Sequence, residues 1–178
     1  EHGVPAGTTR ACFLDDDRSA LLLRPGRDIR LLSLTEPGEA VVLSKGDFTA
    51  ITTLDDGTWL AFDAGTDRIL RQQLSGDAVG EVVELEASEP LVGGIEPFRD
   101  VVALEPHPDG VLVVERDAHR VRLVGWDGSE RIRIGGKGGE AGRFRFPVDV
   151  ATTPDGGMLV VDRDNHRIQS FAADGTWI

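Results

Sequence analysis

The sequence is poor in cysteine, in long apolar runs and in basic residues, and each shortage removes a class of structure or partner. Cys12 is the only cysteine, which excludes an internal disulfide and a cysteine-based metal cluster. No apolar run approaches the roughly 18 residues that a membrane-spanning helix needs, so we expect no direct membrane insertion. Only 19 Lys and Arg residues stand against 31 Asp and Glu residues. The resulting net charge of −12 disfavours nucleic acid and anionic lipid surfaces as partners.

Glycine and proline, by contrast, punctuate the whole chain. The sequence has 22 glycines and 9 prolines, which recur between short apolar runs. This texture is typical of many short strands joined by tight turns, and not of long helices. A chain of this length can also form one domain with a sizeable core, because it buries roughly 70% of its unfolded surface. The composition therefore predicts a single all-β domain over residues 1–178.

The chain repeats a pattern every 40 to 50 residues. An Asp-Gly turn pair opens three repeats, at residues 56, 109 and 155, and a short apolar run follows each pair. Next come an acidic residue and, five positions later, an arginine followed by a β-branched residue. These acid–arginine pairs are Asp63 and Arg68, Glu115 and Arg120, and Asp162 and Arg167. A looser first copy begins at Asp17, with Asp28 where the other repeats carry the arginine.

Each repeat contains about four predicted strands. They cover residues 10–13, 20–23, 29–34 and 40–43 in the first repeat, and 49–53, 58–62, 68–74 and 79–85 in the second. In the third repeat they cover 101–104, 111–115, 121–126 and 131–134, and in the fourth 148–152, 158–161, 168–172 and a short 176–178. Four-stranded units at this period indicate β-propeller blades, because one such sheet cannot bury its faces alone. We place the blades at about residues 9–45, 46–90, 91–139 and 140–178.

The fourth repeat resembles the NHL repeat. Residues 142–175, GRFRFPVDVATTPDGGMLVVDRDNHRIQSFAADG, follow the pattern Gly-x-Phe, Pro, a short strand, Asp-Gly, V-x-D and N-H-R-I-x-x-F. The third repeat is a good second copy, and the second repeat keeps the acid, the arginine and the isoleucine. The resemblance implies a β-propeller, which in this family usually has six blades. The four NHL-like repeats then form either a closed four-bladed ring or an arc of a larger propeller.

The acid–arginine pairs recur in every well-matched repeat, which indicates a role in building the fold. We expect each pair to tie the hairpin between the second and third strands; a ring of ligand-binding groups is the alternative. His119 and His166 stand at equivalent positions, but a catalytic zinc site needs three protein ligands, so we predict no metal. The glycine-rich stretch 135–144 lacks the Ser or Thr that follows the lysine of a phosphate-binding loop, and it matches the linker before an NHL blade.

Polar residues at the start of the innermost strands are the candidates for ligand binding. In a propeller these strands line the central channel, and Arg99, Asp100 and Asp149 fall at such positions. The alternative is that they are solvated strand-start residues. Peptide-amidating lyases resemble NHL propellers and take their zinc histidines from these strands. The comparable positions are about Ala11, Ala50, Asp100 and Asp149, and none is a histidine.

The sequence therefore predicts a non-catalytic binding or scaffolding propeller that mediates protein–protein interaction within a larger protein or assembly, without a cofactor. One alternative is an extracytoplasmic ligand-sensing propeller, resembling those on bacterial receptor kinases. Another is a propeller enzyme of the lyase or lactonase type. The chain opens on Glu1, either a mature terminus after signal cleavage or an internal start. The sequence does not determine the cellular compartment, but an extracytoplasmic location is slightly favoured.

Overall fold

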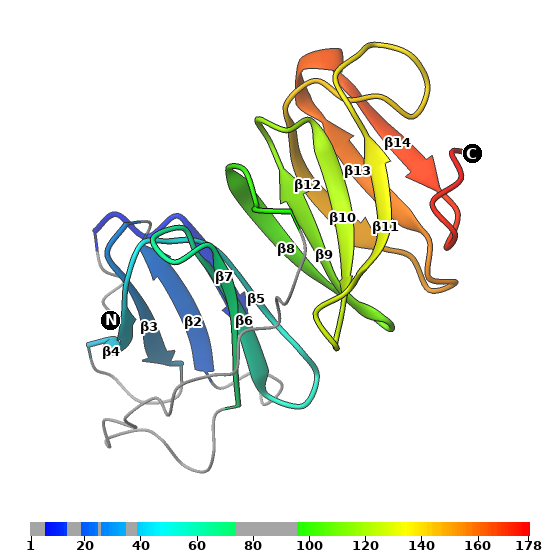
Figure 1. The fold of residues 1–178 in the computed structure, drawn as a ribbon. Helices are drawn as coiled ribbons and strands as arrows, with labels where there is room; N and C mark the ends of the chain where they lie inside the picture. Colours follow the sequence, from blue (N-terminus) through cyan, green and yellow to red (C-terminus); the bar gives the residue numbers. More distant parts are fainter. Residues whose placement is uncertain (1–5, 14–18, 25, 35–38, 74–95) are drawn as a thin grey trace. The chain divides into compact units, whose positions relative to one another are not determined.

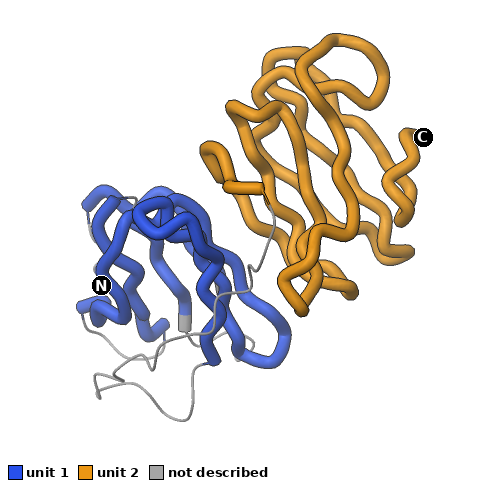
Figure 2. The backbone as a smooth tube through the Cα atoms, in the orientation of Figure 1, with its two compact units in different colours: residues 1–90 blue, residues 91–178 orange. Residues whose placement is uncertain are grey.

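The computed structural model describes residues 6–13, 19–24, 26–34, 39–73 and 96–178 (Figure 1). This part of the chain is all-β, as predicted, with 14 strands in four antiparallel sheets and one short 3-10 turn. Within it, no helix is long and apolar enough to cross a membrane. The chain divides into two compact units, unit 1 (residues 1–90) and unit 2 (residues 91–178), and each is described by itself (Figure 2).

Unit 1 contains two sheets in which each strand pairs with the next along the chain. Sheet 1 consists of β1 (Arg10–Phe13), β2 (Ser19–Arg24), β3 (Asp28–Ser33) and β4 (Val41–Lys45). Sheet 2 consists of β5 (Phe48–Thr53), β6 (Thr58–Asp63) and β7 (Arg68–Gln73). These strands agree with the predicted ones to within two residues. The strand predicted at 79–85 lies outside the described residues.

Unit 2 repeats this arrangement. Sheet 3 consists of β8 (Val101–His107), β9 (Gly110–Glu115), β10 (Arg120–Gly125) and β11 (Glu130–Gly135). Sheet 4 consists of β12 (Pro147–Thr152), β13 (Met158–Asp162) and β14 (Arg167–Phe171), with the 3-10 turn Arg163–Asn165 between the last two. The strand predicted at 176–178 is reduced to one bridge between Phe171 and Trp177. In sheet 3 the equivalent residues, Val124 and Glu130, pair at the start of β11. The bridge therefore marks the start of a fourth strand in sheet 4.

Asp-Gly pairs form the turns between the first and second strands of sheets 2 and 4. Gly57 and Gly156 have φ angles of 78° and 79°, in the left-handed region that favours glycine. The N–H of Gly57 donates to the carbonyl oxygen of Leu54 at 3.2 Å, and that of Gly156 donates to Thr153 at 2.8 Å. The same turn chemistry therefore sets the hairpin in two repeats.

A bulge interrupts the first strand of three sheets at the same place. The strand pairs on either side of it are Phe48–Asp63 and Ala50–Phe62 in sheet 2, Val101–Glu115 and Ala103–Val114 in sheet 3, and Pro147–Asp162 and Asp149–Val161 in sheet 4. In each sheet the acid of the motif lies opposite the residue just before the bulge. A bulge adds one unpaired residue to one strand. Because it occurs at the same place in these three sheets, it gives a common reference point from which equivalent residues can be matched.

This alignment corrects the sequence-based comparison of the innermost strands. Asp149 is equivalent to Ala50 and Ala103, so the prediction that Asp100 is its counterpart is wrong by three residues. Strand β1 has no bulge and pairs Arg10 with Leu23, which makes Arg10 the counterpart in sheet 1 and not Ala11. Spacing from the Asp-Gly pairs gives the same alignment, because Ala50, Ala103 and Asp149 each stand six residues before the aspartate at 56, 109 or 155.

One sheet packs on the next through the same positions in both units. The buried cluster of unit 2 consists of Ala103, Leu112, Val114, Val121, Leu123, Ile134, Phe144, Val150, Met158, Val160 and Phe171. The cluster of unit 1 consists of Leu21, Leu23, Ile29, Leu31, Phe48, Ile51, Trp59 and Ala61. In the alignment Leu21 corresponds to Leu112, and Ile51 corresponds to Val150. Facing apolar side chains from two sheets thus form each core, which a single sheet could not enclose.

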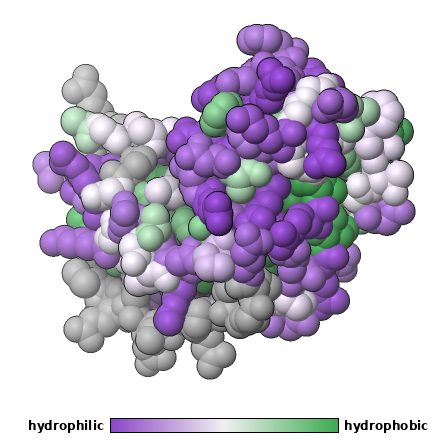
Figure 3. Space-filling view, turned by 45° about the horizontal axis from the view of Figure 1, so that its top comes forward, coloured by the Kyte–Doolittle hydropathy of each residue, from purple (hydrophilic) through white to green (hydrophobic). Residues whose placement is uncertain are grey.

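The outer surface is mostly hydrophilic in the view of Figure 3, where an apolar area is nevertheless exposed on the right-hand side. Among the described residues, the large exposed apolar side chains are Val41, Leu159, Ile168, Trp177 and Ile178. Four of these five belong to the last repeat. Apolar exposure is therefore concentrated on sheet 4 and the residues that follow it.

Leu112 and Leu159 occupy equivalent positions in β9 and β13, yet Leu112 is 0% exposed and Leu159 is 39% exposed. We expect Leu112→Ala to lower the free energy of unfolding by about 2–5 kcal/mol, because it opens a cavity in the core. Leu159→Ala is the matched control and should cost less than about 1 kcal/mol. Urea denaturation of both variants measures the difference. Equal losses would contradict the packing described for sheet 3.

Candidate functional site

A fully buried carboxylate ends the second strand of sheet 3. Glu115 is 0% exposed, and its oxygens accept four hydrogen bonds. The Nε and Nη2 atoms of Arg120 donate to it at 2.8 and 3.0 Å, and Nε of Arg122 donates at 2.6 Å. The fourth donor is the backbone N–H of Arg99, at 2.8 Å. The carboxylate thus joins the β9–β10 hairpin to the segment that leads into β8.

The arginines around Glu115 have further acidic partners. Arg122 is itself 0% exposed; it lies 4.3 Å over the ring of Phe98 and donates to Glu130. Arg120 and Arg133 both donate to one oxygen of Glu96, at 2.9 and 3.0 Å. Hydrogen bonds from Arg120 and Arg133 lower the pKa of Glu96, and those from Arg133 and Arg122 lower the pKa of Glu130. Three carboxylates and three guanidinium groups therefore balance in one network.

Asp162 occupies the same place in sheet 4, with a different set of donors. It is 0% exposed and accepts from Nε of Arg167 at 2.9 Å and from the backbone N–H of Arg145 at 2.7 Å. Asn165 and Gln169 donate side-chain N–H groups to it at 2.8 and 3.1 Å. Arg145 and Gln169 are equivalent to Arg99 and Arg122. The acid again holds the incoming segment, which supports the structural interpretation of the pair.

The second repeat departs from this pattern. Asp63 and Arg68 face each other in the register of β6 and β7, but the oxygens of Asp63 accept from the N–H of Gly65 and the hydroxyl of Thr66. The residue equivalent to Arg99 is Gly46, whose N–H donates to Arg27. Without that backbone donor, the carboxylate of Asp63 accepts hydrogen bonds from the loop that follows β6. Among the described residues, no ion pair links Asp63 to Arg68.

The first repeat carries the pair with its charges exchanged. Arg24 stands in the place of the acid and Asp28 in the place of the arginine, opposite each other in β2 and β3. Nη1 of Arg24 lies 3.5 Å from Oδ2 of Asp28, and Arg30 donates to the same carboxylate at 3.1 and 3.2 Å. This exchange explains why the sequence pattern failed to match the first repeat at Asp28.

The family of the last repeat can now be stated, because residues 144–171 match the family model of the NHL repeat. The fourth repeat is an NHL repeat. The match covers the incoming segment from Phe144, the acid Asp162, the 3-10 turn and β14, and it confirms the resemblance drawn from the sequence. No curated protein matches the chain.

Two of the solved structures that resemble the chain come from Bacteroides species. A protein of unknown function from Bacteroides caccae has a TM-score of 0.60 and 14% identity, over 94% of this chain and 58% of that one. An auxiliary nutrient binding protein from Bacteroides thetaiotaomicron has a TM-score of 0.68 and 14% identity, over 96% of this chain and 46% of that one. The chain spans about half the length of these structures. Identities this low indicate a shared fold alone.

The two histidines of the NHL-type loops lie in different surroundings. His119 is buried, and its Nδ1 accepts the backbone N–H of Phe146, the residue just before β12, at 3.0 Å. The rings of His119 and Phe146 meet edge to face, with centroids 4.6 Å apart. His166, at the equivalent position 47 residues later, is exposed. In the described part of the chain, no group of three or more His, Cys, Asp or Glu residues could hold a metal ion.

His107 is buried, although it belongs to a Pro-His-Pro-Asp-Gly segment and such turns ordinarily lie on the surface. The ring is 5% exposed and links two sheets. Its Nδ1 accepts the N–H of Asp109 at 3.1 Å, so the proton is on Nε2, which donates to the carbonyl oxygen of Gly156 at 3.0 Å. Proline and Asp-Gly residues predict the turn, but they do not show that a neighbouring turn covers it.

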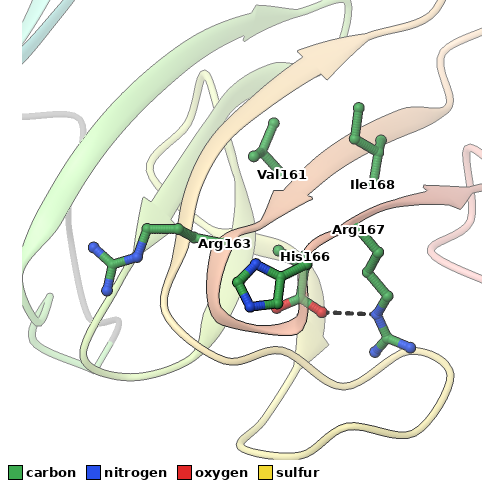
Figure 4. A pocket seen from close by; sticks show the side chains of 6 residues that line it. Val161, Arg163, His166, Arg167 and Ile168 are labelled. Carbon is green, nitrogen blue, oxygen red and sulfur yellow. Dashed lines mark hydrogen bonds and ion pairs between the residues drawn. The ribbon is translucent and has the colours of Figure 1, made fainter.

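A pocket of about 420 Å³ lies beside the exposed histidine of sheet 4 (Figure 4). Figure 4 shows Val161 and Ile168 on the two strands, with the ring of His166 at the loop between them. The lining residues are Val161, Asp162, Arg163, His166, Arg167 and Ile168. The pocket therefore combines an apolar wall, an imidazole ring and the acid–arginine pair of the NHL motif, in which Asp162 is buried and Arg167 is partly exposed.

The predicted channel residues lie at two places along the first strands of unit 2. Asp100 precedes β8 with a φ of 52°, and its carboxylate accepts from Arg116 at 2.7 and 3.2 Å. Arg99 contributes its backbone N–H to Glu115. Asp149 is exposed in β12, where one oxygen accepts the N–H of Val150 at 3.1 Å. The counterparts of Asp149 in the other sheets are Arg10, Ala50 and Ala103, and none is a histidine.

The sequence reasoning missed several members of the site. Arg122 and Gln169 follow the motif arginines by two residues, so they lie on the same side of the strand and reach the same acid. That spacing was visible in the sequence. The contact between Phe146 and His119 was not visible there, because it depends on the path of the backbone between sheets 3 and 4.

Glu115→Gln should lower the free energy of unfolding by about 3–5 kcal/mol, because two buried guanidinium groups lose the charge that compensates them. Asp63→Asn is the matched control: its carboxylate accepts only local loop donors, and we expect a loss below about 1 kcal/mol. Urea denaturation provides both values. A small effect of Glu115→Gln would show that the buried carboxylate does not hold the hairpin and the incoming segment together.

Burial, with the charge of Lys137 adding to it, lowers the pKa of His119 from its ordinary value of 6.5. As pH falls below 6.5, the unfolded chain binds a proton that the folded chain does not, so stability decreases. His119→Asn keeps a side-chain acceptor and tolerates the φ of 54°, but it does not titrate. We expect its melting temperature to depend less steeply on pH between 6.5 and about 5 than that of the parent chain. Identical profiles would contradict this role.

Proposed function

We propose that the chain is a non-catalytic binding module built as a β-propeller, in which the four sheets are blades. Three observations support the propeller arrangement: the strands of each sheet follow the chain order, one sheet packs on the next through the same positions in both units, and the last repeat is an NHL repeat. Repeat architectures of this kind stack each unit on its neighbour.

The observation that favours binding over catalysis is the use of the buried ionisable groups by the fold itself. Glu115 and Asp162 each accept four hydrogen bonds, including one from the segment that enters the sheet. A general base needs a carboxylate within reach of a substrate proton, and these two carboxylates are 0% exposed. They act as fixed points of the scaffold and leave its surface for recognition.

The first-strand edge of unit 2 is the surface that we propose for a protein partner. Strands β8 and β12 are the edge strands of sheets 3 and 4 and lie side by side in Figure 1. This edge presents Asp149 in one strand and the Asp100–Arg116 pair beside the other. In a propeller the first strands line the channel, so these side chains would meet a partner segment there.

Site-specific crosslinking tests this proposal. A photoreactive amino acid at position 149, added to an extract of the cells that make the protein, should trap a defined partner protein. The same group at position 174, an exposed aspartate in the hairpin after β14, should not. Equal trapping at both positions would contradict a binding site at the first-strand edge. Turnover of an ester, lactone or peptide substrate that Asp149→Asn abolishes would contradict the non-catalytic role.

A small-molecule ligand is the second candidate, favoured by the fold similarity to the auxiliary nutrient binding protein. Such a ligand would raise the melting temperature of the chain, because binding at 100 times its Kd stabilises a protein by about 2.7 kcal/mol. A panel of sugars and amino acids, applied to the parent chain and to Asp149→Ala, separates the two candidates. A rise in the parent chain alone would favour the small-molecule role.

A further inference from the structure

Sheet 4 exposes apolar side chains at positions that are buried in sheet 3. Ile168 in β14 is 66% exposed, whereas its counterpart Val121 in β10 is 1% exposed. Leu159 in β13 is 39% exposed, whereas its counterpart Leu112 is 0% exposed. The same residue types thus stand in two environments, and the difference lies in what covers them.

In sheet 3 these positions are covered by the repeat that follows, which contains sheet 4. Leu112, Val114, Val121 and Leu123 pack against Val150, Met158 and Val160 of sheet 4. In unit 1 the equivalent residues of sheet 1, Leu21, Leu23, Ile29 and Leu31, pack against Ile51, Trp59 and Ala61 of sheet 2. The structure therefore contains this interface twice. The face of sheet 4 that carries Leu159, Val161 and Ile168 is the corresponding side of a third such interface.

The pocket beside His166 corresponds to an occupied place in the third repeat. In the third repeat the equivalent place, beside His119, is filled by Phe146 of the segment that leads into sheet 4. The backbone N–H of Phe146 donates to Nδ1 of His119, and the two rings meet edge to face. Phe146 has a φ of 51°, so its backbone takes the left-handed conformation to reach this place. His166 presents the same imidazole, next to Val161 and Ile168, to an open pocket.

We propose that this face and the His166 pocket together form the docking site for a further repeat of the same type, joined in tandem as the fourth repeat is joined to the third. The occupant would insert an aromatic residue beside His166, donate that residue's backbone N–H to the imidazole, and cover Leu159 and Ile168 with aliphatic side chains. Both solved structures that the chain resembles are longer than the matched region, which makes up 58% and 46% of them. This docking does not depend on the binding function proposed above.

The short strand after β14 fixes how such a repeat would be joined. Trp177 faces Phe171 as Glu130 faces Val124, so Ile178 is equivalent to Arg131. A second copy of residues 132–178, added directly after Ile178, would therefore complete the fourth strand and continue in register. The copy is 47 residues long, the spacing that separates His119 from His166.

The test compares the parent chain with this extended chain. In the added copy, the histidine of the NHL loop is replaced by asparagine, so that modification of His166 itself can be followed. Diethyl pyrocarbonate should modify His166 at least about tenfold more slowly in the extended chain, because the ring is then reached only when the added repeat opens. Amide hydrogen exchange in β13 and β14 should slow in parallel.

Two substitutions decide whether the protection comes from the proposed contacts. Replacing the phenylalanine of the added copy that is equivalent to Phe146 by alanine should restore fast modification of His166. Ile168→Asp should leave the melting temperature of the parent chain nearly unchanged, since the side chain is exposed there, but should lower that of the extended chain. If His166 is modified equally fast with and without the added copy, the proposal is wrong. It is also wrong if the parent chain dimerises in light scattering and Ile168→Asp makes it monomeric, because the face then joins two copies.

Discussion

Unit 2 depends on burying one carboxylate in each of its two repeats and satisfying it from three directions. An unpaired carboxylate removed from water would cost several kcal/mol, which only close and well-directed donors can offset. Glu115 and Asp162 obtain these donors from the arginine that begins the third strand, from the residue two positions further along that strand, and from the backbone of the segment that enters the sheet. The last donor matters most for the architecture, because it ties the chain before the first strand to the hairpin of the second and third. A sheet and its linker therefore form as one unit.

Much of this fold could be predicted from the sequence, because local chemistry determines it. The Asp-Gly pairs predict the turns through the left-handed φ of Gly57 and Gly156, and the apolar runs predict the buried second strands. The NHL resemblance predicts the last repeat. Two features were missed. The prediction matched Asp100 with Asp149, although Ala103 is the residue that stands six positions before its Asp-Gly pair, as Asp149 does. An exchange of charges hides the pair Arg24–Asp28 in the first repeat, because the pattern requires the acid before the arginine.

The candidate site was harder to predict than the fold, because it depends on which neighbour covers which residue. The pattern of the sequence treats His119 and His166 as equals, yet one is sealed by Phe146 and the other is exposed. His107 shows the same effect, since its Nε2 donates to the carbonyl oxygen of Gly156, 49 residues away in the neighbouring sheet. In a repeat protein the sequence of one unit encodes a surface, and its neighbour decides whether that surface is core or solvent-exposed.

The two complete carboxylate sites also show how one motif tolerates different residues. In sheet 3 the third strand supplies Arg122, which adds a second positive charge beside Glu115, and Glu96 and Glu130 compensate it. In sheet 4 the third strand supplies the neutral Gln169, and the single pair of Asp162 and Arg167 is already balanced. Charge neutrality is thus restored within each repeat, although the residues that achieve it differ.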